Sequence, residues 1–280
     1  MKIAVTGATG FIGRHVIAAL ASGHDEIIGA SRSTPAAVPT GIRHVALDIA
    51  EPENAFERLG RPDVVVHLAW QGLSNYRSLS HFETELPRQF GFLRRLIDDG
   101  LLRLVVAGTC YEYGMRSGPL DETMAGVSSN GYGHAKLALL QQLEFLQAQI
   151  PFELSWARLF YSWGAGQAPS SLWSQLQAAV ARGDARFPMS GGEQLRDFLP
   201  VETVAGHLAM LARRAEGAGI INICSGRPVS VRGLVERWLA ENGWSIELAL
   251  GHYPYPDHEP LAFWGCAARL AGLYRSAQAG

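Results

Sequence analysis

Three glycines near the start of the chain impose the strongest constraint on its fold. Gly7, Gly10 and Gly13 follow directly on an apolar run at residues 2–6 and open a helical pattern at residues 11–21. Glycine here permits a tight turn and close backbone approach, and the helix N-terminus offers free N–H groups to phosphate oxygens. This context predicts a pyrophosphate-binding turn, with a glycine-rich turn that binds no ligand as the alternative. The predicted contact residues are Gly7, Thr9, Gly10, Phe11, Ile12 and Gly13.

Apolar runs and helical patterns alternate over the first 160 residues. Two of the runs, Val64–Val66 and Leu104–Val106, have no polar alternation, which is typical of strands that a parallel sheet buries on both faces. We therefore expect an α/β fold with a doubly wound, Rossmann-type parallel sheet. The expected strands are residues 2–6, 26–31, 44–47, 63–69, 101–108 and 153–159, and the expected helices are residues 11–21, 82–98 and about 131–149.

The pattern changes after residue 160. Glycine, proline, serine and tryptophan become frequent at residues 163–169 and 187–192, and such stretches are typical of binding loops. Helices are expected at residues 201–214 and 231–241, with a short strand at residues 220–223 between them. The expected domains are a dinucleotide-binding domain, residues 1–160 plus about 197–225, and a smaller C-terminal lobe, residues 161–196 and 226–280.

Composition and charge are those of an ordinary globular protein. The chain has 280 residues, 18% of them charged, and a formal net charge of −2, which indicates neither a nucleic-acid nor a membrane partner. The N-terminus lacks the apolar core of a signal peptide, so we expect a cytoplasmic location. Cys110, Cys224 and Cys266 show no C-x-x-C spacing, so neither a disulfide framework nor a metal site is expected.

The end of the second predicted strand bears on the choice of dinucleotide. An acidic residue there would bind the ribose 2′-hydroxyl of NAD, whereas this chain has Ser31 followed by Arg32, which would accommodate the 2′-phosphate of NADP. NADP(H) is therefore favoured and NAD(H) stays open, because Arg32 could also be a solvated loop residue. Asp48, after the third strand, is placed to accept a hydrogen bond from the adenine amino group, or to act as an acid near a helix N-terminus before Pro52.

The helix expected from residue 131 carries a tyrosine and a lysine one turn apart. Of the 24 lysine and arginine residues, only Lys2 and Lys136 are lysines, which suggests that Lys136 has a role that arginine cannot fill. Tyr132 precedes it by four residues and shares its helix face. A nearby ammonium and an oxidised nicotinamide would lower the pKa of the phenol, so that it acts as general acid in reduction or general base in oxidation. The alternative is a solvated pair on an exposed helix.

Thr109 follows the strand expected at residues 101–108, at the sheet edge where open α/β folds gather their ligands. Its hydroxyl is placed to donate a hydrogen bond to a substrate carbonyl oxygen while Tyr132 delivers the proton. A buried threonine at a strand end, without a catalytic role, is the alternative interpretation.

Together these motifs resemble the extended short-chain dehydrogenase/reductases, and most closely the NAD-dependent epimerase/dehydratase family that acts on nucleotide sugars. The resemblance rests on the glycine turn, the Tyr132–Lys136 pair and two segments, residues 67–69 and 109–114. It continues through residues 158–160, 164–167, 196–201 and 222–226, and so spans almost the whole chain. It implies a catalytic triad of Thr109, Tyr132 and Lys136, a nucleotide-sugar site in the smaller lobe, and a homodimer.

The resemblance also implies particular ligand contacts. Beyond the glycine turn, the cofactor is expected to contact Ser31, Arg32, Asp48, Ile49, Leu68, Ala69, Tyr132 and Lys136. The nucleotide-diphosphate sugar is expected to contact Trp70, Thr109, Cys110, Tyr111, Tyr161 and Arg196. Arg196 would reach the diphosphate, because an arginine fork suits phosphate oxygens. An ion pair of Arg196 with Asp197 or Glu202 is the alternative.

Departures from the family pattern narrow the expected reaction. The 4,6-dehydratases carry an Asp-Glu pair after the threonine, where this chain has Cys110 and Tyr111. Epimerases retain NAD tightly, which fits poorly with Arg32. Residues 253–260 and 263–265 resemble the sugar-side lobe of the 4-ketoreductases. We therefore expect an NADPH-dependent reductase of the C4 carbonyl of a nucleotide-linked 4-keto-6-deoxyhexose. The alternatives are an NAD-dependent nucleotide-sugar epimerase and a catalytically silent, NADP-binding regulatory protein.

Overall fold

A seven-stranded parallel sheet forms the centre of the molecule. The computed structural model describes residues 1–257 and 259–278. Neighbouring strands follow the order β12, β7, β5, β4, β1, β2, β3, and every pair is parallel. The expected doubly wound, Rossmann-type sheet is thereby confirmed. Its strands are β1 (Lys2–Thr6), β2 (Glu26–Ser31), β3 (Ile42–Ala46), β4 (Val64–His67), β5 (Arg103–Thr109), β7 (Glu153–Leu159) and β12 (Gly219–Ile223).

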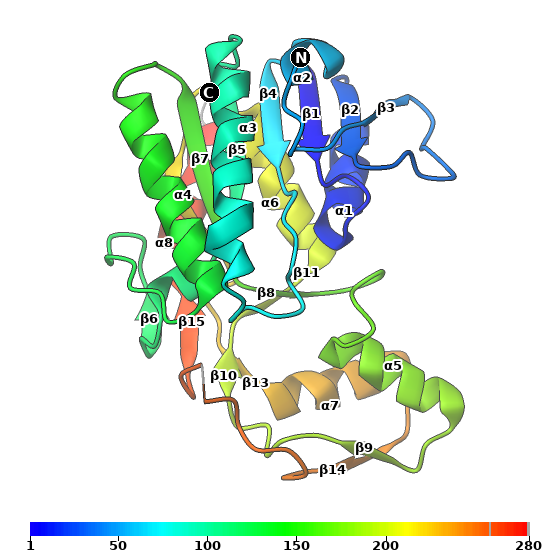
Figure 1. Ribbon diagram of the computed structural model, residues 1–280. Helices are drawn as coiled ribbons and strands as arrows, with labels where there is room; N and C mark the ends of the chain where they lie inside the picture. Colours follow the sequence, from blue (N-terminus) through cyan, green and yellow to red (C-terminus); the bar gives the residue numbers. More distant parts are fainter. Residues whose placement is uncertain (258, 279–280) are drawn as a thin grey trace.

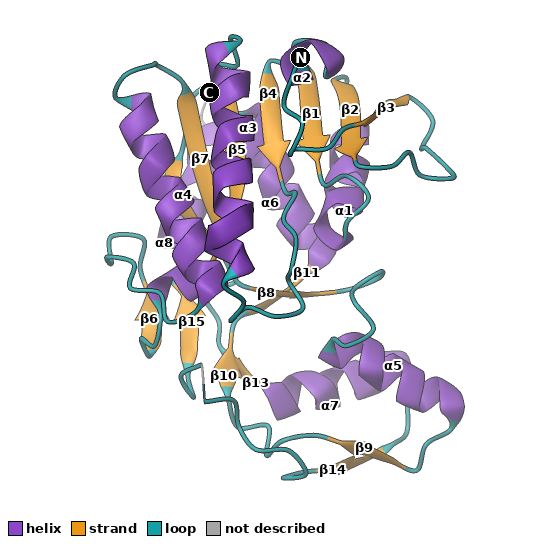
Figure 2. Cartoon of the chain, in the orientation of Figure 1, coloured by secondary structure: helices purple, strands orange, loops and turns teal. Residues whose placement is uncertain are grey.

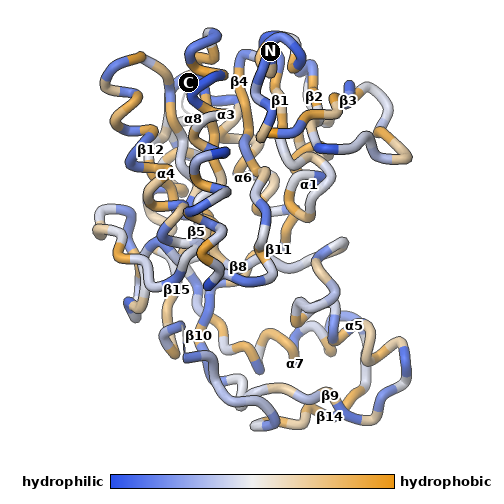
Figure 3. Tube along the Cα trace, viewed as in Figure 1, coloured by the Kyte–Doolittle hydropathy of each residue, from blue (hydrophilic) through white to orange (hydrophobic). Residues whose placement is uncertain are grey.

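Helices cover both faces of this sheet (Figures 1 and 2). Ala4 of β1 packs in one core with α3 and α4, whereas Ile3 and Val5 pack in the other with α1, α6 and α8. Because successive strand side chains point to opposite faces, an unbroken apolar run supplies both cores. Hydrophilic residues lie mainly in outer loops and on exposed helix faces (Figure 3). The helices are α1 (Phe11–Ala21), the short α2 (Ala55–Arg58), α3 (Leu86–Asp98), α4 (Gly131–Gln147), α6 (Val201–Arg213) and α8 (Ala268–Gln278).

A smaller lobe lies beyond the carboxyl ends of the sheet strands (Figure 1). Its centre is formed by α5 (Leu172–Arg182) and α7 (Val231–Asn242). Trp163, Trp173 and Trp238 pack ring against ring, with centroids 4.9 to 5.1 Å apart. Four short strand pairs complete the connections: β8 (Tyr161–Trp163) with β11 (Phe198–Pro200), β9 (Arg186–Pro188) with β14 (Glu247–Ala249), β10 (Leu195–Arg196) with β13 (Val229–Ser230), and β6 (Gly118–Leu120) with β15 (Phe263–Gly265).

The structure corrects several sequence-based expectations. Three residues expected in binding loops belong to the core of the smaller lobe instead: Phe187 and Met189 are buried in it, and the partly buried Trp163 packs against it. The sequence analysis missed α5, which Ser171 caps at its N-terminus and Gly183 ends in a left-handed conformation, and it also missed α8. Strand β3 begins two residues earlier than expected, β4 ends at His67, and a π-helical turn, η1 (His81–Glu85), precedes α3.

A buried hydrogen-bonded chain joins the end of β1 to α3. The Nδ1 atom of His67 lies 2.8 Å from the Thr6 hydroxyl, and its Nε2 atom lies 2.5 Å from Oε1 of Gln89. The amide nitrogen of Gln89 donates to the carbonyl of Ala69, 3.1 Å away, so its oxygen faces the imidazole as an acceptor. Burial, reinforced by the charge of Lys136, lowers the pKa of His67 to about 3. His67 is therefore neutral in the folded protein.

This depressed pKa predicts a pH-dependent stability. The unfolded chain takes up the His67 proton near pH 6.5, whereas the folded chain resists it down to about pH 3. As pH falls through this window, His67 should reduce the free energy of unfolding by up to about 1.4 kcal/mol per pH unit. Urea denaturation of the wild type and of His67→Gln between pH 4.5 and 7.5 measures this, and the variant should show the shallower slope. If the free energy of unfolding changed equally with pH in both proteins, His67 would not be the source of the pH dependence.

Candidate active site

A cleft of about 390 Å³ opens at the carboxyl ends of β1 and β4, where the strand order of the sheet reverses. Parallel α/β folds bind their ligands at such switch points. The structure brings every residue predicted to contact the cofactor to this one cleft. These lining residues are Gly7, Thr9, Gly10, Phe11, Ile12, Gly13, Ser31, Arg32, Asp48, Ile49, Leu68, Ala69, Tyr132 and Lys136.

The glycine turn forms the floor of the cleft with no room for larger residues. Gly7 has a φ of +68°, and a Cβ atom there would lie 2.9 Å from the backbone nitrogen of Ala69. A Cβ atom at Gly13 would lie 2.1 Å from the carbonyl oxygen of Gly7. Helix α1 begins after Gly10 without a side-chain cap, so its first N–H groups are left for a ligand. This cradle fits the pyrophosphate of a dinucleotide.

Polar groups line the far side of the cleft beyond β2. The hydroxyl of Ser31 donates to the carbonyl of Ser33, 2.8 Å away. The exposed side chain of Arg32 spans the cleft and donates from Nη1 to Oε1 of Gln71 at 3.3 Å. Asp48 accepts the backbone N–H of Ala50 at 2.9 Å, which is a turn contact and not a helix cap, since α2 begins at Ala55 with Asn54 as its N-cap. Arg32 thus stands at the mouth of the cleft with its charge available to a phosphate.

Lys136 points its ammonium into the base of the cleft. Its Nζ atom donates to the carbonyl oxygen of Ala107 at 2.7 Å, and it lies 3.9 Å from the centre of the Trp70 ring. The side chain is only 2% exposed, so it is not part of a solvated helix face. Burial lowers the pKa of Lys136 to about 7, while the charges of Glu112 and Glu85 oppose this fall.

Tyr132 lies beside Lys136 in an aromatic enclosure. Its ring stacks on Tyr76, with centroids 5.4 Å apart, and meets Trp70 edge to face at 5.7 Å. The backbone N–H of Tyr132 donates to the carbonyl of Tyr76 at 2.9 Å. Burial raises the pKa of Tyr132, and a hydrogen bond with the Thr109 side chain opposes this rise. The direction is opposite to the lowering expected from Lys136 and an oxidised nicotinamide, because desolvation of the phenolate is the largest cause and the electrostatic effects of Tyr76, Glu112 and Cys110 add to it. The phenol is therefore protonated at neutral pH.

Thr109 ends β5, and a carboxylate holds it in place. Its backbone N–H donates to Oε1 of Glu112 at 2.8 Å, and its hydroxyl accepts the N–H of Tyr111 at 3.3 Å. Glu112 is fully buried, pairs with Nε of Arg158 at 2.7 Å and accepts the indole N–H of Trp156 at 3.0 Å. The sequence analysis missed this network because Glu112 and Arg158 lie 46 residues apart.

Arg196 forms a buried ion pair with Glu259, close to Tyr111. Its Nη2 atom lies 2.9 Å from Oε2 of Glu259, whose side chain is 11% exposed. The hydroxyl of Tyr111 donates to the same carboxylate, and it lies 3.4 Å from the hydroxyl of Tyr161. Cys110 is buried beside this group, and burial raises the pKa of its thiol. The predicted substrate contacts thus fall into two groups. Trp70 lines the cofactor cleft. The others lie together near Glu259: Thr109, Cys110, Tyr111, Tyr161 and Arg196.

The partner of Arg196 differs from both residues named as alternatives. Asp197 instead accepts the backbone N–H groups of Ser225 and Gly226, at 2.7 and 2.9 Å. Glu202 lies 3.6 Å from the imidazole of His15. Glu259 belongs to the segment that sequence analysis assigned to the sugar-side lobe, residues 253–260, of which His258 lies outside the described residues. Its role as the partner of Arg196 had no signal in the sequence, since 63 residues separate the two.

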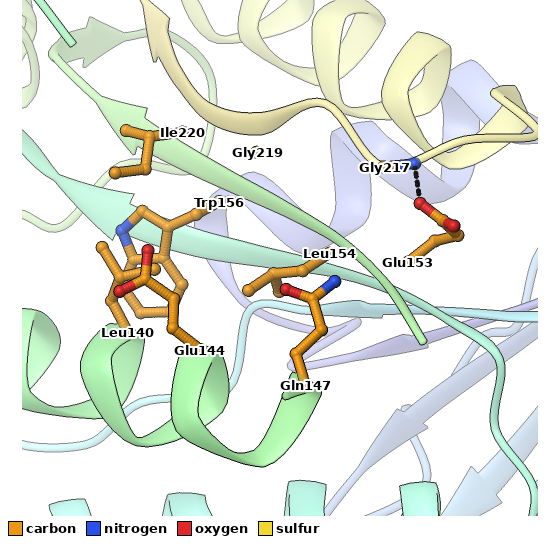
Figure 4. Close-up of a pocket in the computed structure, with 9 residues that line it drawn as sticks. All are labelled: Leu140, Glu144, Gln147, Glu153, Leu154, Trp156, Gly217, Gly219 and Ile220. Carbon is orange, nitrogen blue, oxygen red and sulfur yellow. Dashed lines mark hydrogen bonds between the residues drawn. The ribbon is translucent and has the colours of Figure 1, made fainter. Parts of the chain in front are cut away.

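A second hollow, of about 150 Å³, lies at the edge of the sheet formed by β12 and β7. Figure 4 shows it between the end of α4 and the first residues of β7 and β12. Glu153 there accepts the backbone N–H of Gly217 at 2.7 Å. Its lining includes none of the predicted site residues: Leu140, Glu144, Gln147, Glu153, Leu154, Trp156, Gly217, Gly219 and Ile220.

Among the described residues, 1–257 and 259–278, no helix combines the length and apolar character needed to cross a membrane. No group of three or more His, Cys, Asp or Glu side chains among them is arranged to hold a metal ion.

The sequence is similar to a known protein family and to characterised relatives. Residues 3–224 match the NAD dependent epimerase/dehydratase family. The chain is 29% identical over 270 residues to the dTDP-6-deoxy-L-talose 4-dehydrogenase (NAD(+)) of Aggregatibacter actinomycetemcomitans, covering 95% of this chain and 99% of the relative. It is 28% identical to the dTDP-6-deoxy-L-talose 4-dehydrogenase (NAD(P)(+)) of Kitasatospora kifunensis, covering 91% and 83%.

A solved structure shares the whole architecture. MoeE5 in complex with UDP-glucuronic acid and NAD superposes with a TM-score of 0.81 at 26% identity, over 98% of this chain and 92% of that one. The family match, the sheet order and the glycine cradle agree with one another. The chain belongs to the NAD dependent epimerase/dehydratase family of enzymes.

Proposed function

We propose that this enzyme uses NADPH to reduce the C4 carbonyl of a nucleotide-linked 4-keto-6-deoxyhexose. The observation that carries this proposal is the convergence of three side chains beside the nucleotide cleft: the phenol of Tyr132 hydrogen-bonds to the Thr109 side chain and lies close to Lys136, and desolvation raises the pKa of the phenol, so that it can serve as a proton donor. A reductase needs a proton donor at this point, whereas an oxidation would begin with a base. The two relatives named as 6-deoxy-L-talose 4-dehydrogenases support the same carbon and sugar class, because such an oxidation run in reverse is a C4 carbonyl reduction.

Each side chain has a defined part in this reaction. When bound, the reduced nicotinamide supplies the hydride. Tyr132 donates its phenolic proton to the carbonyl oxygen as charge develops there. Thr109 donates a hydrogen bond to the same oxygen, which stabilises the transition state. Lys136 then favours the phenolate that Tyr132 becomes, since an opposite charge nearby stabilises an anion. Trp70 and Tyr76 pack against the ring of Tyr132 and fix its orientation for this transfer.

The test is turnover with candidate sugars. Purified enzyme should oxidise NADPH stoichiometrically with dTDP-, UDP- or GDP-linked 4-keto-6-deoxyhexoses, and the product should be the corresponding deoxyhexose nucleotide. An epimerase would instead carry tightly held NAD and interconvert sugars without net cofactor consumption. A catalytically silent protein would bind NADPH and turn over none of these compounds. Either result would overturn the proposal.

Tyr132→Phe removes only the transferred proton. We expect kcat to fall by about 10²- to 10⁴-fold, while the dissociation constant of NADPH changes less than twofold because the ring and its stacking partners stay. Steady-state kinetics and NADPH fluorescence titration measure the two quantities. Tyr274→Phe is a matched control, since Tyr274 lies at the surface beside His207. A Tyr132→Phe variant that retains full kcat would refute the proton-donor role.

Arg32 is proposed to bind the 2′-phosphate that distinguishes NADPH from NADH. Among the described residues, its exposed guanidinium donates a hydrogen bond only to the neutral side chain of Gln71. Arg32→Ser should raise the dissociation constant of NADPH by about 10- to 100-fold and leave that of NADH nearly unchanged. Fluorescence titration with both cofactors measures this. Arg94→Ser, on the exposed face of α3, controls for loss of a surface charge. Equal losses for both cofactors would contradict the assignment.

A further inference from the structure

Trp70 makes a contact that neither cofactor binding nor proton transfer requires. It follows β4 at the cleft, and its indole ring lies 3.9 Å from the ammonium nitrogen of Lys136. On another side the same ammonium donates to the carbonyl of Ala107 at 2.7 Å. An ammonium so close to a ring face is attracted by the negative face of the π system, and tryptophan provides the strongest such site.

The orientation of Trp70 is fixed by a second residue. Its indole N–H donates to Nδ1 of His81 at 3.1 Å, and the two rings stack with centroids 6.3 Å apart. The Nε2 atom of His81 lies 2.9 Å from the carbonyl oxygen of Asn75. His81 is fully buried in η1, so the plane of the indole ring is set by a packed element rather than by the cleft.

The charges around Lys136 explain why a ring contact matters. The groups that face it are Tyr132 on its own helix, His67 on β4, His81 and Glu85 on η1, and Glu112 after β5. None of these forms an ion pair with Lys136 among the described residues. Glu112 is paired with Arg158 at 2.7 Å. Glu85 accepts hydrogen bonds from Gln71 and Gln89 and lies 3.6 Å from Arg88.

Burial without an ion pair is costly for an ammonium. The carbonyl of Ala107 and the ring face of Trp70 are the contacts that offset this cost. Arginine would not fit the same place, because its broad guanidinium needs more room than a compact ammonium. This arrangement gives a physical reason for a lysine in a chain that otherwise uses arginine almost throughout.

We propose that Trp70 is a positioning residue whose ring face binds the ammonium of Lys136 and holds it at the nucleotide cleft. His81 acts through Trp70 by fixing its ring. The inference rests on the proposed function only for what Lys136 does next, which is to stabilise the phenolate of Tyr132. Under this proposal Trp70 contacts Lys136, whereas the sequence analysis expected it to contact the nucleotide sugar.

The scarcity of lysine allows a direct test. Protein labelled with [13Cε]lysine should give two lysine side-chain signals, from Lys2 and Lys136, and Lys2→Arg assigns them. Titration of the Lys136 signal in the substrate-free protein reports its charge. Trp70→Leu removes the π face and destabilises the charged form, so the midpoint should fall by about one pH unit. Trp70→Phe should produce a smaller fall.

A shape-preserving variant covers the case in which Trp70→Leu does not fold. Site-specific incorporation of tetrafluorotryptophan at Trp70 weakens the ring quadrupole while keeping the packing, and it should lower the midpoint in the same direction. Trp244→Leu is the matched control, because Trp244 packs on Trp173 in the smaller lobe, 5.5 Å between centroids. It should leave the Lys136 signal unchanged. His81→Leu should shift the midpoint, and should add nothing in the Trp70→Leu background.

Enzyme kinetics then separate the two roles for Trp70. If it positions Lys136, the alkaline limb of the kcat profile in Trp70→Leu moves to lower pH, while KM for the sugar at low pH is unchanged. An unchanged midpoint of the Lys136 titration in both the leucine and the fluorinated variants would overturn the inference. A raised KM for the sugar would then indicate that Trp70 contacts the substrate. Failure of the wild type with every 4-keto sugar would refute the proposed function alone, because the titration needs no substrate.

Discussion

Burying the ammonium of Lys136 constrains three elements of the fold at once. Strand β5 must present the carbonyl of Ala107, helix α4 must start close to it, and the segment after β4 must bring Trp70 over the charge. A buried charge without these contacts would cost several kcal/mol. These contacts also set the position of Tyr132, since Tyr132 lies one helical turn before Lys136 on α4.

Burial affects the two partners of this pair in complementary ways. It lowers the pKa of Lys136 to about 7 and raises the pKa of Tyr132, because in each case the charged form loses hydration. In the proposed reduction, the phenol would keep its proton until a carbonyl oxygen takes it, and the phenolate so formed would favour the charged form of Lys136. Proton delivery by Tyr132 and the charging of Lys136 would then be coupled, because the two groups lie side by side.

Features carried by neighbouring residues could be predicted from the sequence. The glycine turn, the unbroken apolar strands and the Tyr132–Lys136 spacing each need only a short stretch of chain, and all lie where expected. The Glu112–Arg158 and Arg196–Glu259 pairs join residues 46 and 63 positions apart, and no periodicity marks such partners. Trp163, Phe187 and Met189 of the smaller lobe were misread for a related reason, because composition does not distinguish a binding loop from an apolar core.

The two halves of the site therefore differ in how the chain specifies them. The nucleotide half is built from strand ends and one turn, whose geometry is dictated by glycines without side chains. The opposite half gathers Tyr111, Tyr161, Arg196 and Glu259 from four separate segments, and their hydroxyl, guanidinium and carboxylate groups satisfy one another. The carboxylate of Glu259 accepts from Tyr111 and pairs with Arg196, so removing it would take this partner from both groups in a buried place, which costs about 1–3 kcal/mol. The glycine turn depends on backbone geometry, whereas this cluster depends on a set of mutually paired side chains, so one fold can keep the first while the second varies.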